Sequence, residues 1–377
     1  MTQDDATQDL RTQLRESLAR LMQRHYAFEN REQFRRASSG YSAQAWAAYG
    51  DLGLLGLSVS EDAEGLGGGL GDLAVAMDAM GSALALEPLL PSVVFGARLL
   101  DRLGTEEQKA AWLPSLMSGE HIAALAHAER EGRYELDVRE TIARADGAGW
   151  MLTGSKRAVE GGAAAGLLVT SASMEGGATA LFLVEADAPG VTRRARRAFD
   201  GAGVADVDFS EVKLEARALL GGVADAAAAL AWALDEATAL QCADAVGAMR
   251  AANALTLDYV RTRKQFGTAI GNFQALQHRL VDMKIAEVQA RALTQQALVA
   301  LDERRADAAR LVSAAKVRSN LSARLIAQEV VQMHGGMGLT EEYPAAHYFA
   351  RLGLFERRWG DADHHLVRFS AAGSEPI

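Results

Sequence analysis

Two short stretches of this chain carry residue types suited to holding a nucleotide. The first, "RTRKQFGTAIGNFQALQHR", runs from Arg261 to Arg279 and gathers basic side chains in a protein with a net charge of −10. Within it, Arg263 offers a planar donor fork for a phosphate, Phe266 an apolar face, and Gln274 an amide that donates and accepts. A basic loop between helices, with Phe266 anchored in the core, explains the same spacing equally well. The stretch therefore favours either an anion site or a structural turn.

The second stretch is "QMHGGMGLTEEYP", from Gln332 to Pro344. A helical stripe through Leu325 and Gln332 stops at Gly335 and Gly336. Glycines allow backbone amides to converge on a phosphate. Because this stretch follows a helix, it differs from the dinucleotide fingerprint that opens after a strand. Taken alone, it is more typical of a helix C-cap.

Composition limits the classes of function. At 377 residues and 49% hydrophobic, the chain can bury a large core in two or three domains. Its sequence pI near 5.4 argues against nucleic-acid or anionic-membrane partners, so an anion site must be local. The single cysteine, Cys242, is expected to be a buried, inert thiol. The acidic start and the lack of an apolar run of about 18 residues predict a cytoplasmic protein.

The secondary-structure signal of the sequence changes twice along the chain. Residues 1–119 read as an N-terminal helical domain, with Leu10, Leu14, Leu18 and Leu21 on one helical stripe. Residues 120–222 contain short β-prone runs separated by turns, which predicts a middle β domain. From 223 to 377 the helical signal returns in long Ala/Leu-rich segments, which must pack together to be stable.

At this point the sequence resembles the acyl-CoA dehydrogenase family. The resemblance rests on "LGLLGLSV" and "GLGGG" between residues 52 and 69, "FSEVKL" and "LLGG" at the end of the β segment, "RKQFGTAIGNFQ" and "QMHGGMGLTEEYP". The pimeloyl-CoA dehydrogenase small subunits are most similar, sharing "AHAER", "RYEL", "AVGAM", "TRKQFG", "LQHR" and "GDADHH". The resemblance implies an α+β multidomain fold with an N-terminal helical domain, a β-barrel-like middle domain and a C-terminal four-helix bundle.

The resemblance also implies a cofactor, FAD, shared across a subunit interface. The side chains that would reach the adenine-diphosphate part of a neighbouring subunit's FAD are Arg263, Gln265, Phe266 and Gln274, completed by Gln332, Gly335 and Gly336. Partners implied in the same way are an acyl-CoA substrate, an electron-transfer flavoprotein, and either further copies of the chain in a homodimer or homotetramer or a related large subunit. No metal site is expected.

The family reaction is α,β-desaturation of an acyl-CoA thioester, in which a glutamate removes the α proton while flavin N5 accepts a hydride from the β carbon. In the stretch "RRWGDADHH" the base position falls on Gly360, or on Trp359 in a shifted alignment. A second family arrangement places the glutamate on the first long bundle helix, where this chain has Ala237. Glu236 is adjacent, but would point elsewhere unless the helix contains a bulge.

The redox end of the flavin pocket departs from the family pattern as well. The family loop Thr-Glu-Pro-Gly-Ala-Gly-Ser-Asp corresponds to "AEREGRYE" in this chain. Glu129 is identical to the family glutamate, and Glu135 is a conservative replacement of the family aspartate. The family Trp-x-Thr that covers the flavin is "AVE", Ala158 to Glu160. A carboxylate beside the isoalloxazine would disfavour an anionic reduced flavin.

Two explanations of the missing base stay open. In one, a displaced carboxylate, Glu236, Asp361 or Glu356, serves in a homo-oligomer. In the other, the chain is a base-lacking FAD-site or structural subunit of a heteromeric acyl-CoA dehydrogenase. The adjacent His364 and His365 point apart on a helix, so a hydrogen-bonded or solvated pair is favoured over a metal site. The predicted function is an FAD-dependent acyl-CoA dehydrogenase, a flavin oxidoreductase acting on a CH–CH bond, with the heteromeric subunit as the alternative.

Overall fold

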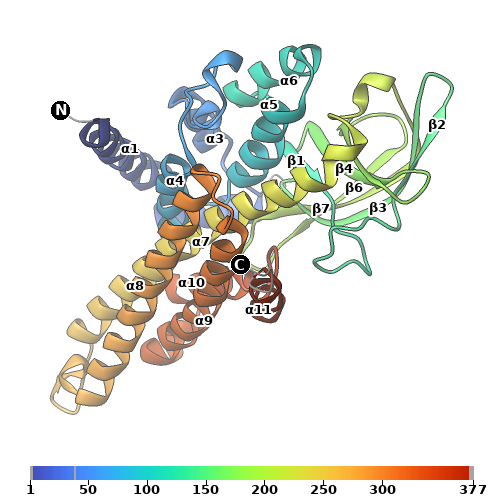
Figure 1. The fold of residues 1–377 in the computed structure, drawn as a ribbon. Helices are drawn as coiled ribbons and strands as arrows, with labels where there is room; N and C mark the ends of the chain where they lie inside the picture. Colours follow the sequence, from blue (N-terminus) through green and yellow to red (C-terminus); the bar gives the residue numbers. More distant parts are fainter. Residues whose placement is uncertain (1–2, 38–39, 373–377) are drawn as a thin grey trace. The chain divides into compact units, whose positions relative to one another are not determined.

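The computed structural model describes residues 3–37 and 40–372, which fold into helices and one large mixed sheet (Figure 1). They form two compact units, each discontinuous in sequence. One unit combines the residues up to 31 with 70–85 and the chain from 238 onward. The other combines 32–69 with 86–237.

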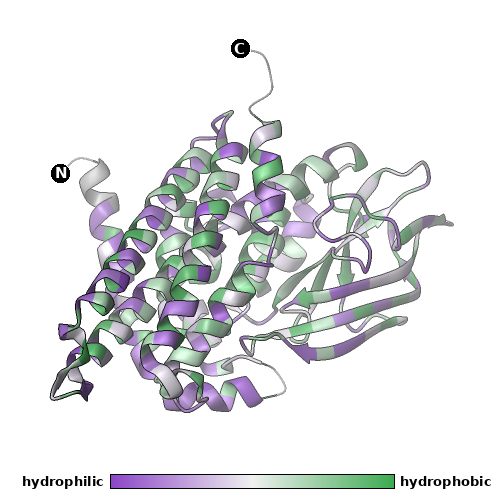
Figure 2. Cartoon of the chain, turned by 90° about the horizontal axis from the view of Figure 1, so that it is seen from below, coloured by the Kyte–Doolittle hydropathy of each residue, from purple (hydrophilic) through white to green (hydrophobic). Residues whose placement is uncertain are grey.

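The first unit is helical. Its elements are α1 (Gln3–His25), α4 (Leu70–Ala83), the later part of α7 (Val223–Thr262), α8 (Gln274–Asp302), α9 (Ala308–His334), α10 (Pro344–Phe355) and α11 (Ala362–Ala371). Figure 2 shows polar and apolar residues interspersed along these long helices, as expected when one face of each helix is buried. Among the residues that the structure describes, no helix has the length and apolar character needed to cross a membrane.

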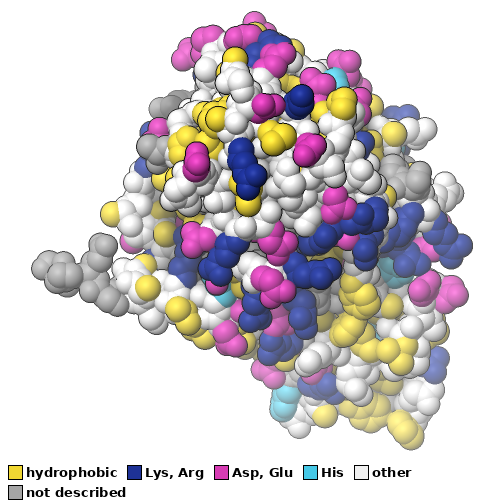
Figure 3. All heavy atoms as spheres, turned by 90° about the vertical axis from the view of Figure 1, so that its right-hand side faces the viewer, with side chains coloured by type: hydrophobic (Ala, Val, Ile, Leu, Met, Phe, Trp, Pro, Cys, Tyr) yellow, Lys and Arg dark blue, Asp and Glu magenta, His cyan; other side chains and the backbone are white. Residues whose placement is uncertain are grey.

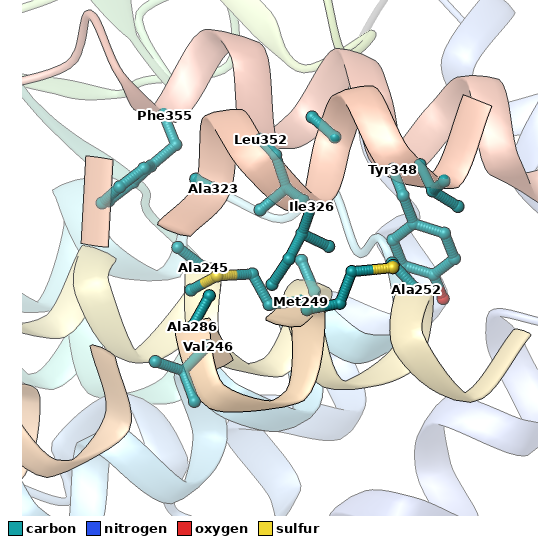
Figure 4. Close-up of a cluster of buried hydrophobic side chains, with 14 of the residues drawn as sticks. Ala245, Val246, Met249, Ala252, Ala286, Ala323, Ile326, Tyr348, Leu352 and Phe355 are labelled. Atoms are coloured by element: carbon teal, nitrogen blue, oxygen red, sulfur yellow. The ribbon is translucent and has the colours of Figure 1, made fainter. Parts of the chain in front are cut away.

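Alanine, branched aliphatic, methionine and aromatic side chains fill the core of this helical unit (Figure 4). Met249 of α7 packs with Ile326 of α9 and Leu352 of α10, all of them buried. Alanines such as Ala245 let the helices approach closely. Cys242 is fully buried in this core and burial raises the pKa of its thiol, which confirms the expected buried, inert cysteine.

The second unit places short helices beside a β sheet. The helices are α3 (Ala43–Asp51), a π-helical turn (Pro91–Arg98), α5 (Leu99–Leu103) and α6 (Glu106–Ser118), with α2 (Phe28–Arg36) entering it at Glu32. The strands are β1 (Ala123–Ala126), β2 (Ile142–Asp146), β3 (Gly149–Glu160), β4 (Leu167–Ser173), β5 (Thr179–Glu185), β6 (Val191–Arg197) and β7 (Gly203–Leu214). The sheet order is β1-β4-β2-β3-β7-β6, with β5 paired to β4.

The end strand β6 is strongly basic. It carries Arg193, Arg194, Arg196 and Arg197, and two of these pair with aspartates of β7, Arg194 with Asp208 and Arg196 with Asp206. Lys and Arg side chains gather on the face of the protein drawn in Figure 3. Charged side chains on an edge strand discourage pairing with strands of other molecules, which explains a local excess of arginine in an acidic protein.

Helices α4 and α7 touch backbone to backbone. A Cβ placed on Gly81 of α4 would overlap the carbonyl oxygen of Asp244, and one on Gly247 of α7 would overlap that of Asp78. The Ser82 hydroxyl donates to the Gly247 carbonyl at 3.1 Å across the same contact. The contact therefore requires glycine at both positions for packing rather than for backbone freedom.

Replacing Gly247 with Ala should lower the free energy of unfolding by about 1–3 kcal/mol, because the added methyl overpacks the helix contact. Chemical denaturation followed by circular dichroism measures it. Gly353→Ala in α10 is the matched control, since a Cβ there meets nothing within 4 Å. That variant should be neutral or slightly more stable because alanine favours helix. Equal effects of both substitutions would contradict the close contact.

Candidate cofactor and active site

The basic stretch folds into a small hairpin that pattern reading did not foresee. After α7 ends at Thr262, β8 (Lys264–Gln265) pairs antiparallel with β9 (Thr268–Ala269). The two residues between them, Phe266 and Gly267, have φ values of 55° and 81°. Positive φ at both central positions is the geometry of a type I′ hairpin turn. The glycine in second place was the available signal.

Phe266 is displayed at the tip of this hairpin. Its side chain is 92% exposed, and its ring meets that of Phe273 edge-on at a centroid distance of 6.2 Å. The alternative reading, in which Phe266 is anchored in the core, is therefore wrong. An exposed aromatic side chain on a strained backbone is a feature that a binding partner or ligand would explain.

The polar side chains of the predicted FAD site are also exposed. Within residues 3–37 and 40–372, the structure gives no side-chain hydrogen bond or ion pair to Arg263, Gln265, Gln274 or Gln332. Arg279 of the same stretch differs, because its Nε donates to Glu329 at 2.6 Å, and this hydrogen bond raises the pKa of Arg279. The guanidinium of Arg263 thus remains available for an external anion.

The glycine stretch lies beside the end of α7. The ring of Tyr259, just before the hairpin, stacks on His334 with centroids 4.4 Å apart, and its hydroxyl donates to the His334 carbonyl at 3.4 Å. Tyr343 also approaches the histidine, with ring centroids 5.1 Å apart, and its ring lies 6.4 Å from that of Tyr259. Helix α9 ends at His334, directly before Gly335. The residues that precede the two predicted nucleotide-binding segments, Tyr259 and His334, therefore contact each other within one unit.

Helix α9 ends where it was expected to, in a backbone conformation that requires glycine. Gly335 has φ 59° and ψ −136°, a combination that other residues avoid. A Cβ on Gly335 or Gly336 would meet no atom within 4 Å. The surface beside them is open, while the Gly335 amide itself donates to the Val331 and Gln332 carbonyls at the end of α9.

These residues fit the diphosphate and adenine of FAD. The exposed guanidinium of Arg263 can donate charge-assisted hydrogen bonds to a phosphate, and Phe266 can offer a stacking face. The amides of Gln265, Gln274 and Gln332 can donate and accept. All of them face outward, which suits a cofactor that is bound in part by another subunit.

Glu236, the candidate base, is engaged in a buried ion pair. Its two carboxylate oxygens accept from Nε and Nη2 of Arg98 at 2.8 and 2.6 Å, and its side chain is 2% exposed. Helix α7 is α-helical at every residue from Val223 to Thr262, so the bulge that would turn Glu236 toward the site of Ala237 is not there. For Glu236 to accept a substrate proton, the pair with Arg98 must open.

Gly360, one of the two positions where the resemblance places the base, has φ 117°, and a Cβ there would lie 2.5 Å from Nε2 of His365. Strain and crowding both oppose a side chain at this position. His365 itself hydrogen-bonds to the Trp359 carbonyl at 2.9 Å and to the Ser313 hydroxyl at 3.3 Å, and burial lowers its pKa to about 3. The turn is built around glycine and a neutral histidine.

The other two displaced carboxylates have structural partners. Asp361 caps α11 by accepting from the His364 amide at 2.9 Å. Glu356 pairs with Arg324, and this hydrogen bond raises the pKa of Arg324. In the described part of the chain, no group of three or more His, Cys, Asp or Glu side chains is arranged to hold a metal ion.

The segments that correspond to the redox end of the flavin pocket lie in the β domain. Glu129 is buried, whereas Glu135 is exposed and paired with Arg139 at 2.6 Å. Ala158 has a positive φ of 50°, and its amide donates to Asp206 at 3.1 Å. The segment 158–160 therefore sits at an irregularity of strand β3, where the register with β7 shifts.

Three family models match the chain in sequence. They are the acyl-CoA dehydrogenase N-terminal domain over residues 8–120, the middle domain over 124–216 and the C-terminal domain over 227–361. FadE12 of Mycobacterium tuberculosis, an acyl-CoA dehydrogenase, is 33% identical over 319 residues, covering 81% of each chain.

Solved structures show the same architecture. The ChsE4–ChsE5 complex of Mycobacterium tuberculosis matches with a TM-score of 0.90 and 27% identity, over 97% of this chain and 98% of the other. A variant of the Tcur3481–Tcur3483 steroid ACAD matches with a TM-score of 0.88 and 29% identity over the same shares.

The fold shared with these solved structures is that of a flavin-dependent oxidoreductase. Together with the three matched domains, it places the chain in the acyl-CoA dehydrogenase family. Its function is accordingly FAD-dependent dehydrogenation of an acyl-CoA, and FAD is its cofactor. The predicted fold of helical, β and helical domains is confirmed.

Gly360→Ala should reduce the free energy of unfolding by about 1–3 kcal/mol, because both the backbone and His365 oppose a Cβ. Urea denaturation gives the value. Gly176→Ala is the control, since Gly176 has a comparable φ of 91° but open space around it. The control carries backbone strain alone and should be less destabilised. A Gly360→Ala variant as stable as wild type would remove the physical reason for glycine here.

Proposed function

We propose that this chain catalyses α,β-desaturation of an acyl-CoA thioester within an oligomer in which each subunit helps to hold its neighbour's FAD. The single observation that carries the proposal is the exposed hairpin with Phe266 at its tip, directly preceded by Arg263, whose side chain has no partner among the described residues. When bound, FAD supplies the hydride-accepting centre. The residues of this hairpin bind and orient its diphosphate and adenine.

A second copy of the chain is the proposed partner, and helix α8 supports it. Val281, Ile285 and Val288 recur at helical spacing on α8 and are each at least 40% exposed. Apolar side chains in such a stripe are covered in stable assemblies. A homodimer or homotetramer would bury the stripe and bring Arg263 to a neighbouring FAD. Electrons are expected to pass to an electron-transfer flavoprotein.

The α-proton base needs a separate assignment. Glu236 is the candidate on this chain, and its use requires that substrate binding open the Arg98 pair. A buried carboxylate in such an ion pair is better suited to holding Arg98 in place than to accepting a proton. Nη1 of Arg98 also donates to the Ser58 carbonyl at 2.8 Å. We therefore infer a structural role for Glu236.

A mixed assembly is the second candidate, and the glycine-requiring turn at Gly360 favours it. In such an assembly, a related subunit carries the base and this chain contributes the FAD-binding hairpin. Two of the similar structures carry the names of two chains, ChsE4–ChsE5 and Tcur3481–Tcur3483. A base-bearing homologue encoded in a neighbouring reading frame would be the partner to co-express.

Arg263→Ala should lower FAD retention about tenfold or more, because a hydrogen bond to a charged group contributes about 1.5–3 kcal/mol. The ratio of flavin absorbance near 450 nm to protein, after gel filtration, measures it. Arg305→Ala is the control, since Arg305 is also exposed and pairs with the neighbouring Asp307. Unchanged flavin content in Arg263→Ala would refute the cofactor assignment.

Adding an acyl-CoA to the purified yellow protein should bleach its flavin band. If Glu236 is structural, Glu236→Gln keeps the bleaching rate near that of wild type while losing thermal stability. If Glu236 is the base, the rate falls by about 10²–10⁴. A colourless homo-oligomer, or one whose flavin bleaches only with a co-expressed homologue, would contradict catalysis by this chain alone and would support the mixed assembly.

A further inference from the structure

One buried lysine in the β domain has no place in the function described so far. Lys156 of β3 has a side chain that is 0% exposed. Its ammonium donates to the His127 carbonyl at 3.0 Å, to Glu129 Oε1 at 2.8 Å and to the Ser171 hydroxyl at 3.2 Å. A buried charge is tolerated when it is paired and fully hydrogen-bonded, and here all three N–H groups have acceptors.

The first branch from this lysine runs through Glu129. The Glu129 carboxylate also accepts the backbone amides of Arg139 and Glu140, both at 2.8 Å, and of Thr141 at 2.9 Å. Burial alone would raise the pKa of Glu129, but the hydrogen bonds from Lys156 and these amides lower it to about 2. The carboxylate therefore fixes the far end of the segment 129–141, which we call the 129–141 loop.

The second branch runs through Ser171 and His127. Nδ1 of His127 is 2.8 Å from the Ser171 hydroxyl, and Nε2 is 3.2 Å from the Glu135 carbonyl. Burial, together with the charge of Lys156, lowers the pKa of His127 to about 4, so the ring is neutral. Because a carbonyl can only accept, Nε2 carries the proton and Nδ1 accepts from Ser171. This branch holds the middle of the loop.

The two branches depend on the same charge. Burial lowers the pKa of Lys156 to about 8, and the carboxylates of Glu129 and Glu140 oppose that shift. Lys156 keeps its proton near neutral pH because Glu129 is beside it, and Glu129 stays ionised because Lys156 and the loop amides solvate it. Removing either partner leaves a buried charge uncompensated.

We propose that Lys156 is a positioning residue that holds the 129–141 loop against the sheet and so shapes the redox end of the FAD site. The proposal rests on the proposed function, because it is the family resemblance that places this loop beside the flavin. The outer side chains Arg130 and Arg133 are exposed, whereas the anchors on β3 and β4 are buried. The loop's conformation is thus set from inside the β domain.

Limited trypsin digestion of the apoprotein tests the positioning without flavin. In Lys156→Met, cleavage after Arg133 should be about tenfold or more faster than in wild type, because local opening exposes the loop backbone. Cleavage at the exposed Arg304–Arg305 turn between α8 and α9, in the other unit, is the internal reference and should not change. Mass spectrometry identifies the cut. A wild-type rate at Arg133, or a parallel rise at both sites, overturns the proposal.

Two further variants keep the test sharp. Glu135→Gln removes only the exposed pair with Arg139 on the same loop, and should leave cleavage at the wild-type rate. Ser171→Ala removes the hydrogen bond to His127 but keeps the Lys156–Glu129 pair. This variant tests the proposal if Lys156→Met does not fold. Faster cleavage after Arg133 in Ser171→Ala is expected, and a wild-type rate contradicts the proposal.

The link to the cofactor has its own measurement. In holoprotein, Ser171→Ala or Lys156→Met should shift the flavin midpoint potential and the shape of its visible band, while Arg305→Ala, in the turn between α8 and α9, should not. If the loop opens as expected but the flavin signals stay at wild-type values, the loop does not shape the redox end, and the proposal fails while FAD binding itself stands. If wild-type protein holds no flavin, the proposed function fails, and the apoprotein digestion still reports on Lys156.

Discussion

The close contact between α4 and α7 is the constraint on which much of the helical unit depends. Gly81 and Gly247 bring the two backbones together, and the buried ion pair of Arg351 with Asp244 lies at the same level of α7. With its axis fixed there, α7 places Tyr259 against His334 and starts the hairpin that displays Phe266. A nucleotide-binding surface on an exposed turn needs such a rigid base, because the turn has few contacts of its own.

Much of the fold could be read from the sequence, since it rests on periodicity and punctuation. The long helical stripes, the β-prone runs after residue 120 and the end of α9 at Gly335 are local signals. The pair of Arg98 with Glu236 was beyond such reading, because its partners are 138 residues apart in the chain. The hairpin at Phe266 was missed because each strand is two residues long, too short to show alternation.

The buried network around Lys156 shows a different limit. Lys156 follows Leu152 and Gly154 at every second position of β3, so period-two alternation places it on the same inward face as a fully buried leucine. Average behaviour assigns lysine to the surface. An inward-pointing Lys156 ammonium is stable only because Glu129, Ser171 and His127 lie close enough to accept its hydrogen bonds. No local sequence pattern predicts that arrangement.

The charges of this chain are distributed unevenly between the two halves of the predicted site. At the adenine end, the exposed Arg263 has no partner within the described residues and is available to an anion. At the catalytic end, Glu236, Asp361 and Glu356 are each bound to an arginine or a helix terminus. A group must be free to change protonation if it is to act as a base, whereas a group that binds phosphate need only be charged and exposed. The geometry therefore supports the proposed role of Arg263 in cofactor binding, whereas the proposed source of the proton acceptor depends on how the subunits assemble.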